Sequence, residues 1–291
     1  MSIKPPTSSS TSDCSAALER LRETLREADA VVVGAGAGLS AAAGLTYAGE
    51  RFQRHFSDFI AQYGLTDMYS AGFYPFPSPE VYWAYWSRHI WYNRYAPLPG
   101  AVYATLLDLL QGRDYFVITT NVDHAFQRAG FDKQRLFYTQ GDYGLWQCAR
   151  PCHEQTYDNQ AEVARMVAEQ REMRIPQALI PRCPVCGGSM AVNLRCDDRF
   201  VEDEGWRAAH SRYEAFLRRC QGRRVLYWEL GVGWNTPGII KLPFWQWTYD
   251  NPRACLSAIN LQDATVPQEI AGRAICIQGD IAQILTVLAR L

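Results

Sequence analysis

The stretch AVVVGAGAGLSAAAG, residues 30–44, decides the fold class. Its first residues form a short β-branched run ending in glycine, which is typical of a strand buried on both faces of a parallel sheet. The glycine-rich turn follows directly and opens a helix of small residues. Glycines at such a turn let backbone N–H groups approach a pyrophosphate. The segment therefore predicts either a dinucleotide site or a tight turn that packs without a ligand.

Further segments along the chain are expected to be strands of the same sheet. They are rich in β-branched and aromatic residues, and helical patterns or long insertions separate them. We expect these strands at residues 114–119, 135–139, 225–231, 254–260 and 274–278. The alternation predicts a Rossmann-type α/β domain, a parallel sheet with helices on both faces.

Composition divides the chain into a tail, a large domain and an inserted module. Residues 1–12 are rich in Ser, Thr and Pro and are expected to be a disordered tail. The Rossmann-type domain is expected to comprise residues 13–141 and 223–291, with a small, polar, zinc-binding domain inserted at 142–222. Within the larger domain, the aromatic run YWAYWSRHIWYNRY, residues 82–95, is expected to pack as core rather than line a pocket.

Charge and hydropathy exclude several classes of partner. The chain has 29 Lys and Arg against 30 Asp and Glu, so its net charge of -1 provides no basic field for nucleic acid or an anionic membrane. No apolar run reaches the roughly 18 residues of a membrane span, and the first residues lack the apolar stretch of a signal peptide. We therefore expect a cytoplasmic protein with neither nucleic acid nor membrane as a partner.

Four of the nine cysteines form a cluster that indicates a metal site. Cys148 and Cys152 are separated by three residues, and Cys183 and Cys186 by two. Each pair can hold one edge of a tetrahedral ion, and thiolates suit zinc. Because four sulfurs leave no position for a catalytic water, the zinc is expected to be structural, although His153 is an alternative ligand. A redox role for the second pair is the competing interpretation.

A hydride-transfer enzyme fits the sequence poorly. Dinucleotide-binding dehydrogenases carry an acidic residue about 20 residues beyond the glycine turn, at the end of a second strand. This chain instead continues as TYAGERFQRHFSDF, residues 46–59, which has a helical pattern. The glycine turn must therefore serve another chemistry, if it binds a nucleotide at all.

The order of motifs over nearly the whole chain resembles the sirtuin family. The similar segments are GAGLS (36–40), TTNVDHAFQRAG (119–130), QG (140–141), the two cysteine pairs, GVG (231–233), IN (259–260) and GDIAQIL (279–285). The resemblance implies that NAD is the co-substrate, with its phosphates on the glycine loop and Asn121 and Asp123 facing the nicotinamide ribose and amide. It further implies cofactor contacts from Gly36, Ala37, Gly38, Ser40, Arg51, Phe52, Asn121, Asp123, Gln140, Gly231, Val232, Gly233, Asn260, Asp280 and Ile281.

Departures from the usual sirtuin pattern point to one subgroup. Gln140 stands where deacylating sirtuins carry a histidine, and NLRCDDRF, residues 193–200, replaces the stretch that clamps acyl-lysine peptides. The proline-Asp-Phe-Arg run after the glycine loop is absent, so Arg51 and Phe52 are expected to replace its contacts. These features resemble the class M, macrodomain-linked sirtuins. That resemblance implies ADP-ribosyl transfer to a lipoylated glycine-cleavage H-like carrier protein, reversed by a paired macrodomain hydrolase.

The exchange at Gln140 suits ribosyl transfer. Deacylation requires a base that activates a ribose hydroxyl, whereas capture of the ribose by a protein side chain does not require that step. An amide can orient ribose hydroxyls by donating and accepting hydrogen bonds. We therefore expect Asn121, Asp123 and Gln140 to be the catalytic residues, with Asn121 and Asp123 as turn or helix caps in the competing interpretation.

Several alternatives remain open on sequence alone. His124 is a possible substitute base, and Arg195 is either a contact for the carrier protein or an ordinary surface charge. The chain could instead be an NAD-dependent lysine deacylase, or a protein that only binds or hydrolyses NAD.

Overall fold

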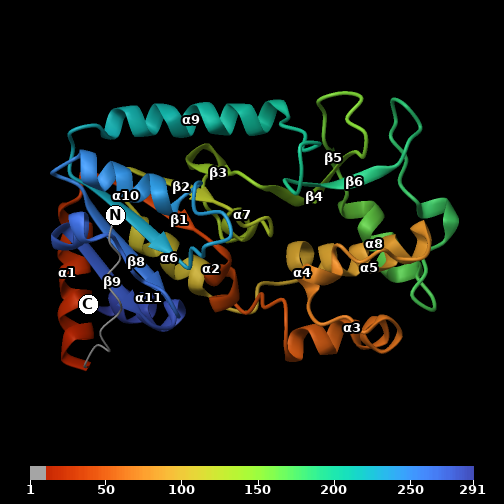
Figure 1. Ribbon diagram of the computed structural model, residues 1–291, viewed down its shortest axis with the longest axis horizontal. Coiled ribbons are helices and arrows are strands. Elements are labelled where there is room, and N and C mark those ends of the chain that lie inside the picture. Colours follow the sequence, from red (N-terminus) through yellow and green to blue (C-terminus); the bar gives the residue numbers. More distant parts are fainter. Residues whose placement is uncertain (1–10) are drawn as a thin grey trace.

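The computed structural model describes residues 11–291, which form two lobes that lie side by side (Figure 1). The expected tail, residues 1–12, lies outside this described part except for its last two residues, which begin the first helix. Within residues 11–291 no helix is both long and apolar enough to cross a membrane.

Six parallel strands form the sheet of the larger lobe. The strands run in the order β3-β2-β1-β7-β8-β9, so the glycine turn follows one of the two central strands. Every residue of β1 and β7 is buried, as the β-branched and aromatic runs predict. The strands are β1 (Ala30–Ala35), β2 (Tyr115–Thr119), β3 (Leu136–Tyr138), β7 (Val225–Leu230), β8 (Cys255–Asn260) and β9 (Ala274–Gln278). All six predicted strands and the α/β fold class are confirmed.

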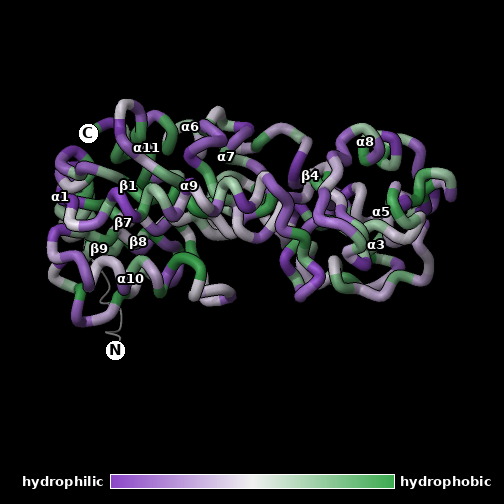
Figure 2. The backbone as a smooth tube through the Cα atoms, turned by 90° about the horizontal axis from the view of Figure 1, so that it is seen from above, coloured by the Kyte–Doolittle hydropathy of each residue, from purple (hydrophilic) through white to green (hydrophobic). Residues whose placement is uncertain are grey.

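Helices cover both faces of this sheet, as predicted, and Figure 2 shows α11 and α6 on one side of the strands and α10 on the other. On the first face, leucines three and four residues apart on the first helix join the apolar side of the strands in one core. That face carries α1 (Thr11–Glu27), α2 (Ala37–Ala42), α6 (Val102–Leu110), α7 (Ala125–Arg128) and α11 (Ile281–Arg290). The second face carries α9 (Glu204–Cys220), α10 (Lys241–Asp250) and the short η4 (Gln268–Arg273).

The smaller lobe has a separate hydrophobic core, built from two distant parts of the chain. Aromatic residues of the first part pack against the strands and helix of the second, as Trp83 does against Trp146 with ring centroids 5.2 Å apart. The first part is α3 (Glu50–Tyr63), α4 (Met68–Ala71), α5 (Pro79–Ile90) and the π-helix η1 (Trp91–Tyr95). The second is β4 (Gly141–Cys148), β5 (Tyr157–Asp158), α8 (Gln160–Glu169), η3 (Gln177–Leu179) and β6 (Met190–Leu194). The aromatic run therefore packs as core, and the strands of the second part form an antiparallel sheet, β5-β4-β6, that we had not expected.

The packing of α9 moves the boundary between the two parts of the molecule. This helix falls within the range 142–222 expected for the inserted module. It packs on the large sheet instead, where the rings of Tyr213 and Phe216 both lie 5.5 Å from that of Phe116 on β2. By packing, α9 belongs to the larger lobe, and the aromatic helices α3 to α5 belong to the smaller one.

Candidate active site

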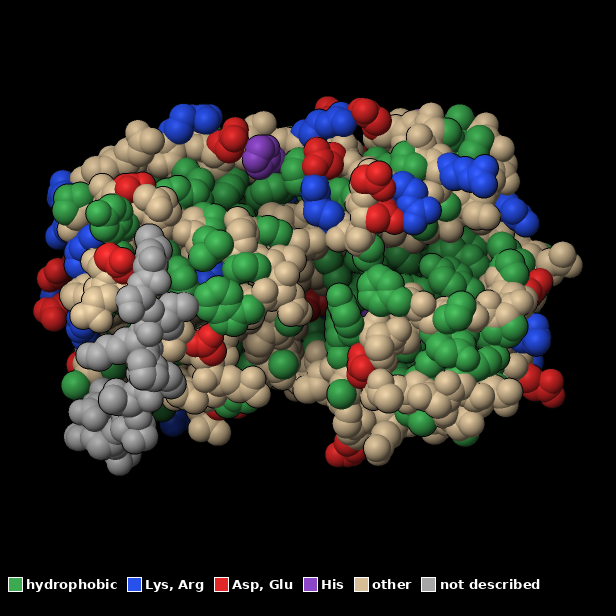
Figure 3. Space-filling model, viewed as in Figure 1, with side chains coloured by type: hydrophobic (Ala, Val, Ile, Leu, Met, Phe, Trp, Pro, Cys, Tyr) green, Lys and Arg blue, Asp and Glu red, His purple; other side chains and the backbone are tan. Residues whose placement is uncertain are grey.

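The loops that follow β1, β2, β3 and β7 meet at the carboxyl edge of the large sheet, beside the smaller lobe. Backbone hydrogen bonds join these loops directly: the Gly36 N–H donates to Leu230, and the Thr139 N–H donates to Thr119. In α/β folds this edge is where ligands bind. Figure 3 shows the molecule hollowed where the two lobes meet, with hydrophobic side chains in the hollow.

The glycines of the turn are required by close packing against the loop after β7. A Cβ at Gly36 would lie 2.6 Å from the Gly231 carbonyl oxygen, and one at Gly38 would lie 2.7 Å from the Gly231 Cα. The N–H of Gly38 donates to Gly231, which has a φ of 62°. By contrast, Ala37 is exposed and its N–H donates to no described residue. The turn thus combines tight packing with one amide that remains available to a ligand.

Asn121 lies at the end of β2 and links two of the loops. Its side-chain amide donates to the Gly36 carbonyl oxygen at 2.9 Å, and its own N–H donates to the Thr119 hydroxyl. The side chain is buried at 9% exposure. This position fixes Asn121 against the glycine turn, and its amide oxygen remains without a partner among the described residues.

Asp123 is used to hold the local structure together. One carboxylate oxygen accepts from the Ser40 hydroxyl at 2.5 Å, and the other accepts from the Ala125 N–H at 2.9 Å. The Ser40 hydroxyl also contacts the Tyr103 hydroxyl at 2.9 Å. Burial raises the pKa of Asp123, although these donors partly oppose the shift. These contacts of Asp123 fit the capping interpretation, and its partner Ser40 is also buried.

Gln140 ends the loop after β3 and is half-buried. Its carbonyl oxygen accepts from the Arg195 N–H at 2.9 Å, while its side-chain amide makes no hydrogen bond to any described residue. Arg195 is paired with Glu202, and its guanidinium lies over the rings of Phe200 and Trp206 at 4.5 and 5.1 Å. Gln140 therefore has a fixed backbone and a side chain available to a ligand.

Phe52, which was expected to contact the cofactor, is buried in the structure, and its role at the cofactor stays a prediction. Phe52 is only 2% exposed, and its ring packs 5.4 Å from that of Phe56 inside the aromatic core of the smaller lobe. Arg51 is also occupied, since its guanidinium donates to the carbonyl oxygens of Thr46 and Tyr92 and to the side chain of Asn93. The segment after the glycine turn is built into the second core.

The segments expected around the adenosine half of NAD present mainly backbone groups at the sheet edge. Val232 and Ile281 are buried, whereas Gly233 is exposed. The Asn260 side chain donates to the Val232 carbonyl oxygen at 3.1 Å, which connects β8 to the loop after β7. The carboxylate of Asp280 caps α11 by accepting from a backbone N–H. These residues shape the loops at the sheet edge, and Gly233 presents backbone to solvent.

The four clustered cysteines meet in space as the spacing predicts. All four sulfurs lie within 4.8 Å of one another, with Cys148 and Cys186 at 3.7 Å and Cys152 and Cys183 also at 3.7 Å. A tetrahedral zinc with bonds of about 2.3 Å holds its sulfurs about 3.8 Å apart. The site therefore fits zinc, and the φ of 69° at Gly187 lets the chain turn back around the second pair.

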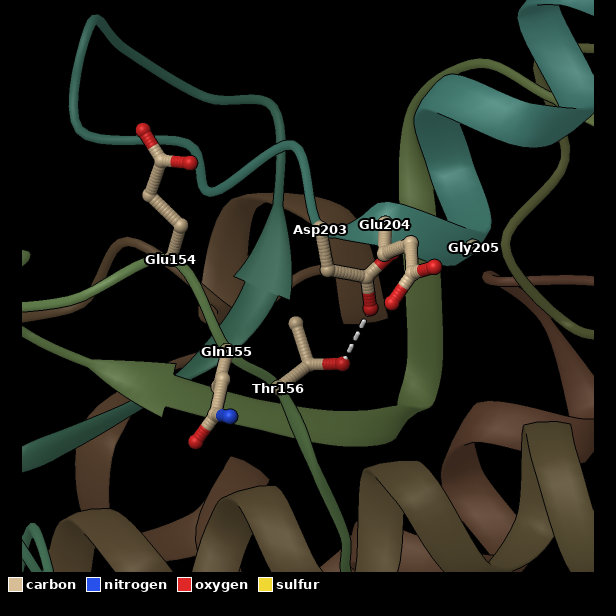
Figure 4. Close-up of a pocket in the computed structure, with 6 residues that line it drawn as sticks. All are labelled: Glu154, Gln155, Thr156, Asp203, Glu204 and Gly205. Carbon is tan, nitrogen blue, oxygen red and sulfur yellow. Dashed lines mark hydrogen bonds between the residues drawn. The ribbon is translucent and has the colours of Figure 1, made fainter.

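A polar hollow lies next to this metal site, between the loop before β5 and the start of α9 (Figure 4). There the Thr156 hydroxyl donates to the Asp203 carboxylate at 2.5 Å, with Glu154 and Glu204 nearby. None of the residues expected to bind the cofactor lines it. The candidate active site is therefore the sheet edge and not this hollow.

Comparison with solved structures places the fold among the Sir2 proteins. A complex of a Sir2 homologue with NAD matches with a TM-score of 0.59 and 18% identity, over 94% of this chain and 92% of that one. A Sir2 protein bound to an acetylated peptide matches with a TM-score of 0.57 and 17% identity, over 94% and 97%. At this identity the likeness shows the fold alone.

Sequence relatives decide the family. No family model matches the chain. It is 42% identical to a Staphylococcus aureus protein named protein ADP-ribosyltransferase, over 94% of this chain and 87% of that protein. The chain belongs to the sirtuin-family protein ADP-ribosyltransferases. A Fusarium oxysporum protein named probable bifunctional ADP-ribose hydrolase/ADP-ribosyltransferase is 36% identical over 93% of this chain, which spans 47% of that relative.

One group of charged residues in this sirtuin-family ADP-ribosyltransferase was not found from sequence. Nδ1 of His124 lies 2.6 Å from one oxygen of Asp142, and Arg94 donates to the other oxygen at 2.8 Å. The three residues come from the loop after β2, from β4 and from η1, so no local spacing connects them. The only available signal was that His124 follows Asp123 directly.

Proposed function

We propose that this sirtuin-family enzyme transfers ADP-ribose from NAD to a lipoylated glycine-cleavage H-like carrier protein and releases nicotinamide. The observation that carries the proposal is Gln140. Its amide replaces the histidine of deacylating sirtuins and has no partner within the described chain. The Staphylococcus aureus relative, named protein ADP-ribosyltransferase, supports the same reaction class.

The residues at the sheet edge fit NAD. A phosphate requires N–H donors that the protein does not use itself, and the exposed Ala37 N–H meets this condition. The Asn121 side chain, fixed by Gly36, presents a free amide oxygen beside the same turn. These two groups and Gln140 would hold the phosphate and nicotinamide-ribose parts of the ligand, with Gly233 and Asn260 on the adenosine side.

The proposed reaction depends on orientation by amides. When bound, NAD supplies the ADP-ribosyl group and a neutral leaving group, nicotinamide. Gln140 can orient ribose hydroxyls by donating and accepting hydrogen bonds, but an amide cannot remove a proton at neutral pH. Asp123 has both oxygens occupied, so it positions the loop that carries Asn121. The residues therefore favour capture of the ribose by an acceptor over activation of a ribose hydroxyl.

A hydrolase that removes the modification is the second proposed partner. The Fusarium oxysporum relative is named as carrying both ADP-ribose hydrolase and transferase activities, and this chain spans 47% of it. We expect this chain to work with a separate macrodomain hydrolase.

The test uses NAD labelled in the adenine half, the purified enzyme and three acceptors. These are the lipoylated carrier, the same carrier without lipoate, and an acetyl-lysine peptide. The proposal expects label on the lipoylated carrier and much less on the unlipoylated form. Equal labelling of both carriers would remove the lipoate requirement. Deacetylation of the peptide with no carrier labelling would favour the deacylase, and nicotinamide release without labelling would favour an NAD hydrolase.

A further inference from the structure

The imidazole of His153 lies against the four-cysteine site without being part of it. Its Nδ1 is 3.0 Å from the Cys152 sulfur. The group of mutually close ligand atoms consists of the four sulfurs, and within residues 11–291 no nitrogen of His153 belongs to it. His153 therefore contacts one ligand from outside the tetrahedron that fits zinc.

A sulfur that binds zinc determines the role of Nδ1. A zinc-bound cysteine is a thiolate, which carries no proton and can only accept a hydrogen bond. Nδ1 is then the nitrogen that carries the proton of the neutral ring, and its N–H donates to Cys152 at 3.0 Å. The lone pair of the ring is left on Nε2.

Tyr157 provides the matching partner on the other side of the ring. Nε2 of His153 lies 2.7 Å from the Tyr157 hydroxyl, and the centroids of the two rings are 5.7 Å apart. A hydroxyl can donate to the lone pair on Nε2, so each nitrogen has a partner of the right kind. Tyr157 belongs to β5 and pairs with Trp146 on β4. The imidazole is thus held between the cysteine site and the antiparallel sheet.

The exposed half of the cysteine site is where this donor acts. Cys148 and Cys183 are buried, whereas Cys152 and Cys186 are exposed. Four thiolates carry more negative charge than one zinc ion neutralises, and hydrogen bonds to a thiolate stabilise that excess. Apart from the cysteines themselves, His153 is the one side chain of residues 11–291 with a donor within hydrogen-bond distance of these sulfurs.

Two contacts with the start of α9 fix the loop that carries this imidazole. The loop lies between Cys152 and β5, beside the polar hollow of Figure 4. Glu154 accepts from Arg207 at 2.7 Å, and the Thr156 hydroxyl donates to Asp203 at 2.5 Å. Arg207 belongs to α9, and Asp203 caps it. These contacts limit the movement of the loop, so the imidazole stays beside Cys152.

We propose that His153 is a positioning residue of the zinc site. Its Nδ1–H donates to the zinc-bound thiolate of Cys152, Tyr157 holds the ring in this orientation, and the hydrogen bond strengthens zinc binding. The inference concerns the metal site and does not depend on the proposed reaction. It also replaces the ligand role that the sequence left open for His153, because Cys152 remains the ligand.

Two substitutions separate the two nitrogens of His153. The side-chain amide of Asn reaches the place of Nδ1, so His153→Asn keeps a donor to Cys152 and gives up the contact with Tyr157. Gln reaches the place of Nε2, so His153→Gln keeps the contact with Tyr157 and gives up the donor. His153→Ala removes both. His55→Ala is the matched control, because this imidazole of the same lobe stacks on Tyr92 with ring centroids 3.7 Å apart.

Zinc affinity is measured by competition with a chromophoric chelator, and the ligand set by the absorption spectrum of the cobalt-substituted protein. His153→Ala and His153→Gln should bind zinc about ten- to a hundredfold more weakly than the parent, as for other lost partners of metal ligands. His153→Asn should recover most of that affinity, and His55→Ala should match the parent. The cobalt spectrum should show four thiolates in every variant. Circular dichroism of the zinc-loaded proteins checks that each is folded.

Four results would overturn the proposal. Parent-like zinc affinity in His153→Ala would show that the donor contributes nothing. Weak binding by His153→Asn together with parent-like binding by His153→Gln would assign the effect to the contact with Tyr157. An equal loss in His55→Ala would trace it to a general loosening of the lobe. A parent cobalt spectrum with three thiolates and one nitrogen, altered in His153→Ala, would make His153 itself a ligand.

Discussion

Gly38 and Gly231 lie in direct backbone contact, with the Gly38 N–H donating to the Gly231 carbonyl oxygen at 2.9 Å. A Cβ built on Gly231 would in turn lie 2.5 Å from the carbonyl carbon of Gly38. Neither position has room for a methyl group, because the nearby atoms are backbone and cannot rotate away. This contact sets the position of the glycine turn relative to the loop after β7.

Gly38→Ala should destabilise the protein by about 1–3 kcal/mol, since the backbone must shift to admit the methyl group. The same shift should weaken NAD binding. Denaturant unfolding and a binding titration measure the two effects. Gly238→Ala is the control, because a Cβ there meets nothing within 4 Å. Equal stability of the two variants would contradict the packing argument.

Removing the metal should destabilise the smaller lobe. Cys183→Ser should reduce zinc from about one ion per chain to little or none, and should lower the midpoint of thermal unfolding. Metal analysis and calorimetry check both outcomes. Cys276→Ser changes an exposed cysteine outside the cluster and should alter neither quantity. Full zinc content in Cys183→Ser would mean that His153 or another ligand replaces the thiolate.

Gln140→Ala should reduce carrier labelling by about a hundredfold, as expected for the loss of a positioned hydrogen-bonding group. Its stability should stay within about 0.5 kcal/mol of the parent, because the Gln140 side chain makes no hydrogen bond within the described residues. The rate of carrier labelling tests the first expectation, and denaturant unfolding tests the second. Labelling at the parent level would remove Gln140 from the mechanism.

Asn121→Ala should lose activity for two reasons at once. It removes an expected ribose contact, and it also removes one of the two donors to the buried Gly36 carbonyl oxygen, which keeps only the Leu39 N–H. The loss of this one hydrogen bond should cost about 0.5–1.5 kcal/mol of unfolding free energy. Denaturant unfolding should therefore separate this variant from Gln140→Ala, and equal stability of the two would contradict the contact.

A buried ion pair gives a prediction with pH dependence. Lys241 is fully buried against Trp234 and Trp245 and donates to one oxygen of Glu229. The other oxygen of Glu229 has no hydrogen-bond partner within residues 11–291. Burial raises the pKa of Glu229, and Lys241 only partly opposes this. Lys241→Met should therefore cost about 3–5 kcal/mol at neutral pH.

The sign of the pH effect follows from the raised pKa of Glu229. A carboxyl group that binds its proton more tightly when folded stabilises the protein at low pH and loses that contribution as the pH rises. The deficit of Lys241→Met should thus be smallest near pH 4 and grow toward pH 7. Urea unfolding across this range measures it, and the double variant with Glu229→Gln should remove the dependence. If the stability that Lys241→Met loses did not change with pH, this would contradict the raised pKa of Glu229.

Local sequence patterns were sufficient to predict the strands of the larger lobe and the four-cysteine metal site. The β-branched run before Gly34 and the cysteine spacings act through neighbouring residues, so a window of sequence contains the whole signal. The six strands and the four sulfurs accordingly lie where they were expected. Asp280 was expected only as a cofactor contact, and the structure shows that its carboxylate also caps α11.

Contacts between distant segments could not be inferred in this way. Phe52 was expected at the cofactor because its segment replaces the proline-Asp-Phe-Arg run of sirtuins. The core that it joins includes residues more than ninety positions later, such as Trp146. Similarly, α9 follows the cysteine cluster in sequence but packs on β2, through Tyr213. The pairing of His124 with Asp142 depends on two loops from different strands running side by side.

The backbone that follows Gln140 belongs to the sheet that carries the cysteine site, whereas the backbone before it belongs to the large sheet. Gly141 pairs with Leu194 of β6, and the Arg195 N–H donates to Gln140 itself, while the same two strands, β4 and β6, lead to Cys148 and to the second cysteine pair. Loss of the metal would consequently disturb the backbone that positions Gln140, the residue that replaces the histidine of deacylating sirtuins. We therefore expect removal of zinc to lower carrier labelling as well as the stability of the smaller lobe.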